Sequence, residues 1–148
     1  MSLSIYSDES FMQEALKEAQ AAFIAGEVPV GAIIVCQNRI IARAHNLTER
    51  LNDTTAHAEM QAFTSASHYL GGKYLYECTL YVTLEPCIMC AGAAFWAQLG
   101  RMVYGADDEK RGYRLVNSAI LHPKTQVTSG VLAEKSTALL KQFFKEKR

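Results

Sequence analysis

The sequence predicts an α/β fold in which one central sheet is covered by helices on both faces. Two observations support this prediction. Segments of β-strand composition alternate along the chain with segments of helical periodicity, which is the order found in α/β proteins. The 148 residues are also enough for one domain with a substantial core, so we expect a single domain over residues 1–148.

The first element is an amphipathic helix over residues 8–25, because its apolar side chains recur at three- and four-residue spacing. Ser7 is its candidate N-cap, and Gly26 follows its last turn. A β-hairpin comes next. Its strands are expected over residues 28–35 and 39–44, with a tight turn at Gln37-Asn38.

A second helix is expected from Thr55 to about Tyr69, where Gly71-Gly72 closes it. β-forming residues over 79–84 predict the next strand. Pro86 is suited to the first position of a helix that runs to about Leu99. The remaining elements are a strand over residues 101–105, an Asp-rich loop, a short strand near Gln126-Val127 and a helix from about Leu132 to Lys145.

The most informative residues are His57-Ala58-Glu59 and Pro86-Cys87-Ile88-Met89-Cys90, which supply an imidazole, a carboxylate and two thiols. Catalytic zinc usually has three protein ligands and keeps a fourth position for water. We therefore expect one zinc ion per chain on His57, Cys87 and Cys90. Glu59 then remains as an unliganded carboxylate beside the metal, free to move protons.

The spacing of these residues is compatible with one metal centre. Cys87 and Cys90 are three residues apart and share a face of a helix, and in its first turn the helix dipole favours thiolates. His57 and Glu59 are two apart, so they converge only where a helix begins. A structural zinc would need a fourth ligand, and the other two thiols have no ligand-like neighbours.

Composition leaves the partner open. Fifteen basic and fifteen acidic residues give a net charge of zero, which neither supports nor excludes nucleic acid. Two basic clusters are candidate phosphate contacts. They are Lys110, Arg111 and Arg114, and the tail residues Lys141, Lys145, Lys147 and Arg148. The tail cluster is equally explained as the solvated end of an amphipathic helix.

The sequence has no apolar run long enough to span a membrane, and its N-terminus lacks the regions of a signal peptide. Two of the four cysteines are assigned to the metal, so no disulfide framework is expected. These features predict a cytoplasmic protein without a membrane partner.

Over nearly its whole length the sequence resembles the cytidine-deaminase-like zinc deaminases, whose general signature is His-x-Glu with Pro-Cys-x-x-Cys. Longer motifs make it most similar to the bacterial tRNA-specific adenosine deaminases. These are residues 26–32, 55–59, 83–93 and 103–106, with Asn46. The resemblance implies a three-layer α/β/α fold with a mixed sheet of about five strands, one zinc ion per chain and a homodimer. The apolar helix over residues 88–99, which carries Trp96, could form the interface or pack in the core.

The resemblance further implies hydrolytic deamination of adenosine to inosine at the wobble position of a tRNA anticodon loop, by zinc-activated water. Glu59 would move protons, Asn46 would hydrogen-bond the base, and Asp108 would contact the ribose or the nearby backbone. From the residues alone, a turn residue is the lesser alternative for Asn46, whereas Asp108 could equally be part of a solvated acidic turn.

Two features depart from the family pattern. Tyr113-Arg114-Leu115 stands where small residues are usual, and the stretch over residues 121–125 is shorter. Both lie where the family builds its substrate edge, so a deaminase of free guanine, cytosine or their nucleosides is an alternative. A catalytically silent, zinc-stabilised binding module is another. The presence of Glu59 argues against the module, since a structural zinc site has no use for an unliganded carboxylate.

Overall fold

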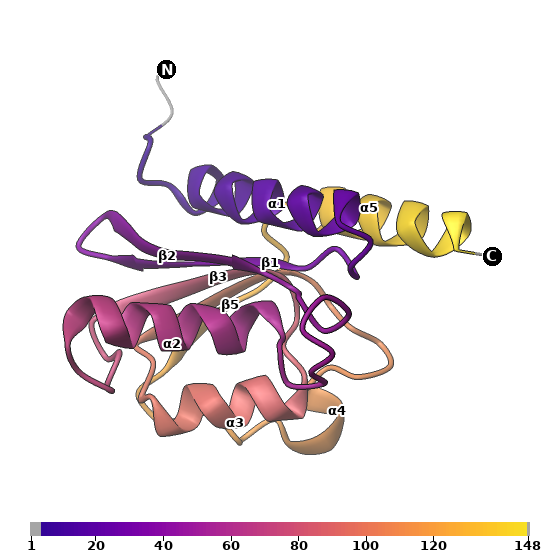
Figure 1. Cartoon of the computed structure of the whole chain (residues 1–148). Helices are drawn as coiled ribbons and strands as arrows, with labels where there is room; N and C mark the ends of the chain where they lie inside the picture. Colours follow the sequence, from indigo (N-terminus) through magenta and orange to yellow (C-terminus); the bar gives the residue numbers. More distant parts are fainter. Residues whose placement is uncertain (1–3, 148) are drawn as a thin grey trace.

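A computed structural model describes residues 4–147 and places a five-stranded mixed sheet between two layers of helices, as expected from the sequence (Figure 1). In chain order the elements are α1 (Asp8–Ile24), β1 (Gly31–Cys36), β2 (Arg39–His45), α2 (Ala58–Leu70), β3 (Cys78–Leu84), α3 (Ile88–Trp96), β4 (Arg101–Ala106), α4 (Arg114–Asn117), β5 (Gln126–Thr128) and α5 (Ala133–Glu146).

The order of the strands places the ends of β2, β3 and β4 at one edge of the sheet. The strands lie in the order β2-β1-β3-β4-β5. β1 runs antiparallel to both β2 and β3, whereas β3, β4 and β5 are parallel. The loops that follow β2, β3 and β4 therefore leave the sheet at the same edge. The outermost strands are less regular, because the pairing of β1 with β2 contains a bulge and β5 has only three residues.

Each face of the sheet has its own hydrophobic core. Helices α1 and α5 cover one face, and α2 and α3 cover the other (Figure 1). Side chains alternate along β1, so that Ile33 and Val35 pack with α1 while Ala32 and Ile34 pack with α2 and α3. At Gly31 a β-carbon would collide with the backbone of α1, so glycine permits the close approach of this helix.

The predicted starts of two elements were wrong for local reasons. The first strand begins at Gly31 rather than at residue 28, because Pro29 has no N–H for the ladder and Val30 donates to the Val28 carbonyl instead. Helix α2 begins at Ala58, because Asp53 binds the amide and hydroxyl of Thr55 and holds a turn before it.

Helix α3 begins at Ile88, two residues after Pro86, and ends at Trp96 rather than at Leu99. Gln98 adopts a left-handed conformation with φ of 52° and terminates this segment before Gly100. Trp96 is 78% exposed, so a role in the core of the single chain is excluded. Between residues 4 and 147, no helix is both long and apolar enough to cross a bilayer.

Candidate metal centre and active site

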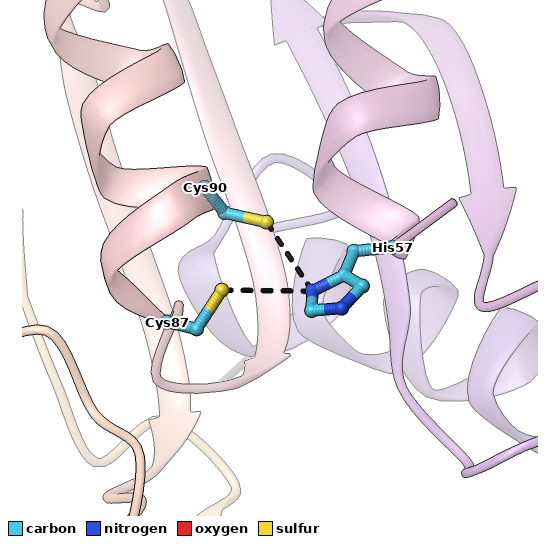
Figure 2. A group of neighbouring side chains, drawn as sticks. All are labelled: His57, Cys87 and Cys90. Carbon is cyan, nitrogen blue, oxygen red and sulfur yellow. Dashed lines mark hydrogen bonds between the residues drawn. The ribbon is translucent and has the colours of Figure 1, made fainter. Parts of the chain in front are cut away.

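His57, Cys87 and Cys90 come together where α2 and α3 begin (Figure 2). The Nδ1 atom of His57 lies 3.6 Å from the Sγ of Cys87 and 3.5 Å from the Sγ of Cys90. The three ligand atoms all lie within 4.8 Å of one another. The structure therefore brings together the three residues expected to bind metal.

These separations fit a tetrahedral zinc ion. Bond lengths of about 2.3 Å to sulfur and about 2.05 Å to nitrogen at a tetrahedral angle give a nitrogen–sulfur separation of about 3.6 Å. The two observed separations match this value. Thiolates combined with imidazole are donors that suit zinc, and three ligands leave a fourth position for a reactant.

The starts of two helices hold the ligands, although not quite as the sequence suggested. His57 is the N-cap of α2, which agrees with the expected convergence of His57 and Glu59 at a helix start. Cys87 is the N-cap of α3, with extended backbone, and lies outside the first turn that Pro86 was expected to begin. Cys90 is then the third helical residue. An N-cap side chain naturally approaches that position, which brings the two sulfurs together.

Glu59 lies in the first turn of α2 and is 4% exposed. Burial raises the pKa of its carboxyl to about 7, and a hydrogen bond from the backbone amide of Glu59 itself partly opposes this shift. Glu59 is therefore a buried carboxyl with a pKa near neutrality, and it lies beside the candidate metal ligands.

The three ligand side chains also shift one another. The hydrogen bond from Cys90 lowers the pKa of the Cys87 thiol to about 4, and His57 adds to this shift. The same contact with Cys87, together with burial, raises the pKa of Cys90. The hydrogen bond to Cys87 raises the pKa of His57. Cys87 is thus the preferred thiolate, and a divalent cation would favour ionisation of both sulfurs.

Asn46 follows β2 directly and is 6% exposed. Its backbone amide donates to the Val30 carbonyl, and its side-chain amide donates to the Thr48 hydroxyl at 3.5 Å. Leu47, the next residue, binds the carbonyl of Ala56 and so ties this loop to the start of α2. Asn46 therefore lies at the edge of the sheet where the candidate metal ligands also lie.

Asp108 lies in the loop after β4, at the same edge of the sheet. One of its carboxylate oxygens accepts hydrogen bonds from the amides of Lys110 and Arg111, as in a loop-forming turn. Over residues 4–147, neither Asp108 nor Asn46 hydrogen-bonds to the three candidate ligands.

Two buried carboxylates support these loops, and neither was identified from the sequence. Glu27 is fully buried and accepts the amides of Glu49 and Arg50 in the loop before α2. Glu85 is 3% exposed and binds Asp108 and Arg114. Burial would raise the pKa of Glu85, but the hydrogen bonds from Arg114 and from backbone amides lower it on balance. An acidic residue inside an apolar segment, as in Leu84-Glu85-Pro86, is the signal that could have identified Glu85.

The two basic clusters differ in their surroundings. Lys110 and Arg111 are exposed in the loop after β4, whereas the guanidinium of Arg114 is bonded to Glu85 and Asp107. The sequence placed Arg114 in one basic cluster with Lys110 and Arg111, but its ion pairs within the protein set it apart from them. Lys141, Lys145 and Lys147 lie on or next to α5, across the sheet from α2 and α3 (Figure 1). Arg148 lies outside the described residues.

Comparisons with known proteins agree with this geometry. A family model of the MafB19-like deaminases matches residues 6–148. The tRNA-specific adenosine deaminase of Agrobacterium fabrum is 45% identical over 143 residues, which cover 93% of this chain and 94% of that protein.

Two solved structures are also similar. One, from a study of A-to-I editing by tRNA:A34 deaminases at the wobble position, matches with a TM-score of 0.81 and 42% identity, covering 88% of this chain and 98% of that chain. A guanine deaminase from Bacillus subtilis matches with a TM-score of 0.65 and 40% identity, covering 68% of this chain and 65% of that chain. The family match spans almost the whole sequence, and the Agrobacterium relative aligns over nearly its full length. The chain therefore belongs to the family of MafB19-like deaminases, and it groups there with the tRNA-specific adenosine deaminases.

Proposed function

We propose that this protein deaminates adenosine to inosine at the wobble position of a tRNA anticodon loop. The observation that carries the proposal is the His57, Cys87 and Cys90 cluster with the buried carboxyl of Glu59 beside it. The adenosine deaminase relative, similar over nearly its full length, supports tRNA as the substrate class. A silent zinc-binding module is disfavoured, because Glu59 is not needed to hold a metal.

In this proposal His57, Cys87 and Cys90 hold one zinc ion per chain. When bound, zinc would act as a Lewis acid and lower the pKa of a water molecule to about 7. Glu59 accepts a proton from the attacking water and passes it to a ring nitrogen, and a second transfer goes to the leaving amine. Water adds at C6 of adenine and ammonia leaves, which gives inosine. The near-neutral pKa of Glu59 suits a group that must both accept and donate.

Asn46 and Asp108 are proposed to bind the substrate. The side-chain amide of Asn46 would hydrogen-bond the edge of the base, and Asp108 would contact the ribose or the adjoining nucleic-acid backbone. Both follow strand ends at the edge of the sheet where α2 and α3 begin. A base inside a duplex cannot reach such a site, so a single-stranded loop with an unstacked nucleotide is the expected substrate. A tRNA substrate also implies a cytoplasmic location.

The substrate is tested by giving the protein a labelled anticodon stem-loop with a wobble adenosine, beside free adenosine, guanine and cytosine. We expect inosine in the stem-loop and little turnover of the free compounds. Guanine is the most informative control, because the Bacillus guanine deaminase shares 40% identity over much of the chain. Efficient turnover of guanine or cytosine, without inosine in any stem-loop, would contradict the tRNA substrate. It would not contradict the proposed zinc-dependent deamination.

We further propose that two copies associate through the exposed apolar side of α3 and α4. Ile88 and Trp96 are eight residues apart on α3 and so share one side of the helix. Leu115 and Val116 on α4 are 62% and 67% exposed. An apolar surface of this kind is typical of a protein interface.

Replacing Trp96 with glutamate should convert the dimer to a monomer, because a charge would be buried at the interface. Light scattering coupled to size exclusion measures this change. Ile24→Glu is the matched control, since Ile24 is 86% exposed on α1, on the other side of the sheet. A monomeric wild-type protein, or a Trp96→Glu variant that stays dimeric, would contradict this interface.

A further inference from the structure

Glu85 occupies the short connection between β3 and the metal-binding segment of α3. Its side chain is almost fully buried, and its carboxylate accepts hydrogen bonds from both ends of the loop that follows β4. One oxygen accepts the amide of Asp108 at 3.1 Å, and the other accepts the amide of Arg114 at 3.2 Å. A single carboxylate thus holds both ends of the loop over residues 108–114.

The guanidinium of Arg114 completes this arrangement. Its Nε and Nη2 atoms donate to the two oxygens of Glu85, each at 3.2 Å. Nη2 also lies 2.9 Å from a carboxylate oxygen of Asp107, and the guanidinium carbon lies 5.5 Å from the centre of the Tyr104 ring. Two carboxylates and an aromatic face therefore fix the Arg114 side chain, although it is 43% exposed.

The backbone of the loop is also fitted to Glu85. At Gly112 a β-carbon would overlap the Glu85 carboxylate, so a larger residue there would have to displace this side chain from its hydrogen bonds. The amide of Tyr113 donates to the Pro86 carbonyl at 2.9 Å, directly before the candidate ligand Cys87. The loop that carries Asp108 and the turn that carries Cys87 are therefore joined side by side.

We propose that Arg114 is a positioning residue for the deamination reaction. Through Glu85 it fixes the loop of Asp108 against the turn that presents Cys87. Arg114 belongs to the three residues that depart from the family pattern, and this role explains an arginine there without a phosphate contact. Its charge is already neutralised by Glu85 and Asp107, which leaves little positive charge for an RNA backbone.

The first test follows backbone protection in the free protein and needs no substrate. In Arg114→Ala, Glu85 keeps its two backbone donors but loses both side-chain donors. We expect amide hydrogen exchange over residues 107–114 to speed up by about tenfold or more, with zinc content unchanged. Arg43→Ala is the matched control, because Arg43 on β2 has a similar exposure and pairs with two carboxylates of α1, away from the loop over residues 107–114. Unchanged exchange over residues 107–114 would overturn the proposal.

The second test is kinetic and rests on the proposed function. With the substrate that wild type turns over, Arg114→Ala should lower kcat/KM by about 10–100-fold, the usual range for groups that orient a metal site. Most of the loss should appear in KM, because the loop carries a substrate contact rather than the proton shuttle. Arg114→Lys should recover only part of the lost kcat/KM, since lysine has the charge of arginine but not its forked geometry. Full activity in Arg114→Ala would overturn the positioning role.

Salt dependence separates this role from direct phosphate binding. If Arg114 contacted a phosphate of a single-stranded loop, its removal would reduce the slope of log KM against log salt by about 0.7. A positioning residue leaves the slope unchanged. A reduced slope with unchanged hydrogen exchange would therefore assign Arg114 to the substrate instead. The exchange result stands whichever base the enzyme deaminates, so failure of the tRNA assignment would not be mistaken for failure of this proposal.

Discussion

Glu59→Gln should abolish turnover while the fold and the zinc content stay as in wild type. Glutamine keeps the shape of the side chain but can neither accept nor deliver a proton, and a general acid–base group contributes about 10²–10⁴-fold to rate. Because Glu59 is buried and does not belong to the ligand cluster, its neutral isostere should be tolerated. The measurement is single-turnover formation of inosine, with circular dichroism and metal analysis on the same preparation.

Glu134→Gln, on the first turn of α5, serves as the control for loss of a carboxylate elsewhere. The control should react at the wild-type rate. A Glu59→Gln enzyme with more than about a tenth of wild-type activity would show that another group moves the proton, since the expected contribution is at least about a hundredfold.

Cys87→Ala should lose the metal and, with it, all activity. It removes one of three ligands, and alanine offers no donor in its place. Cys87 also has the lowest pKa of the two clustered thiols, so it is the sulfur most readily ionised for binding. Metal analysis of the purified variant should find zinc far below one equivalent, against about one in wild type.

Cys36→Ala is the matched control, because Cys36 is a free thiol at the end of β1 and not a member of the ligand cluster. It should keep its zinc. Full zinc retention by Cys87→Ala would mean that the ion is bound elsewhere, and the assignment of all three ligands would then fail.

The clustering of His57, Cys87 and Cys90 could be predicted because its signal is short in sequence. His57 with Glu59, and Cys87 with Cys90, each lie within one turn of chain, so residue type and spacing already limit their geometry. The layers of the fold were predictable for a similar reason, since strand and helix periodicities are local. What was missed at α3 is also local: Cys87 has extended backbone, and it separates Pro86 from the first helical residue, Ile88.

The residues that brace the site could not be predicted in this way. Glu27 binds amides 22 and 23 positions away, and Glu85 binds Arg114 at a distance of 29 positions. Their partners are largely backbone amides, which every residue except proline carries, so no residue type marks them. Helix α4 has only four residues, too few to show a helical period. From the sequence, Arg114 was therefore grouped with Lys110 and Arg111 as a candidate phosphate contact, because its carboxylate partners were not recognisable.

The irregular outer strands of the sheet bear on how copies of this protein can meet. An unpaired strand edge can bind another chain through its free amides and carbonyls, which leads to aggregation. Here β2 carries Arg39 and Arg43 and is interrupted by the bulge in its pairing, while β5 offers only three residues. Neither border is a good template for adding a strand. Growth of the sheet into fibres is thereby discouraged, and side-chain contacts between helices are left as the easier route to self-association.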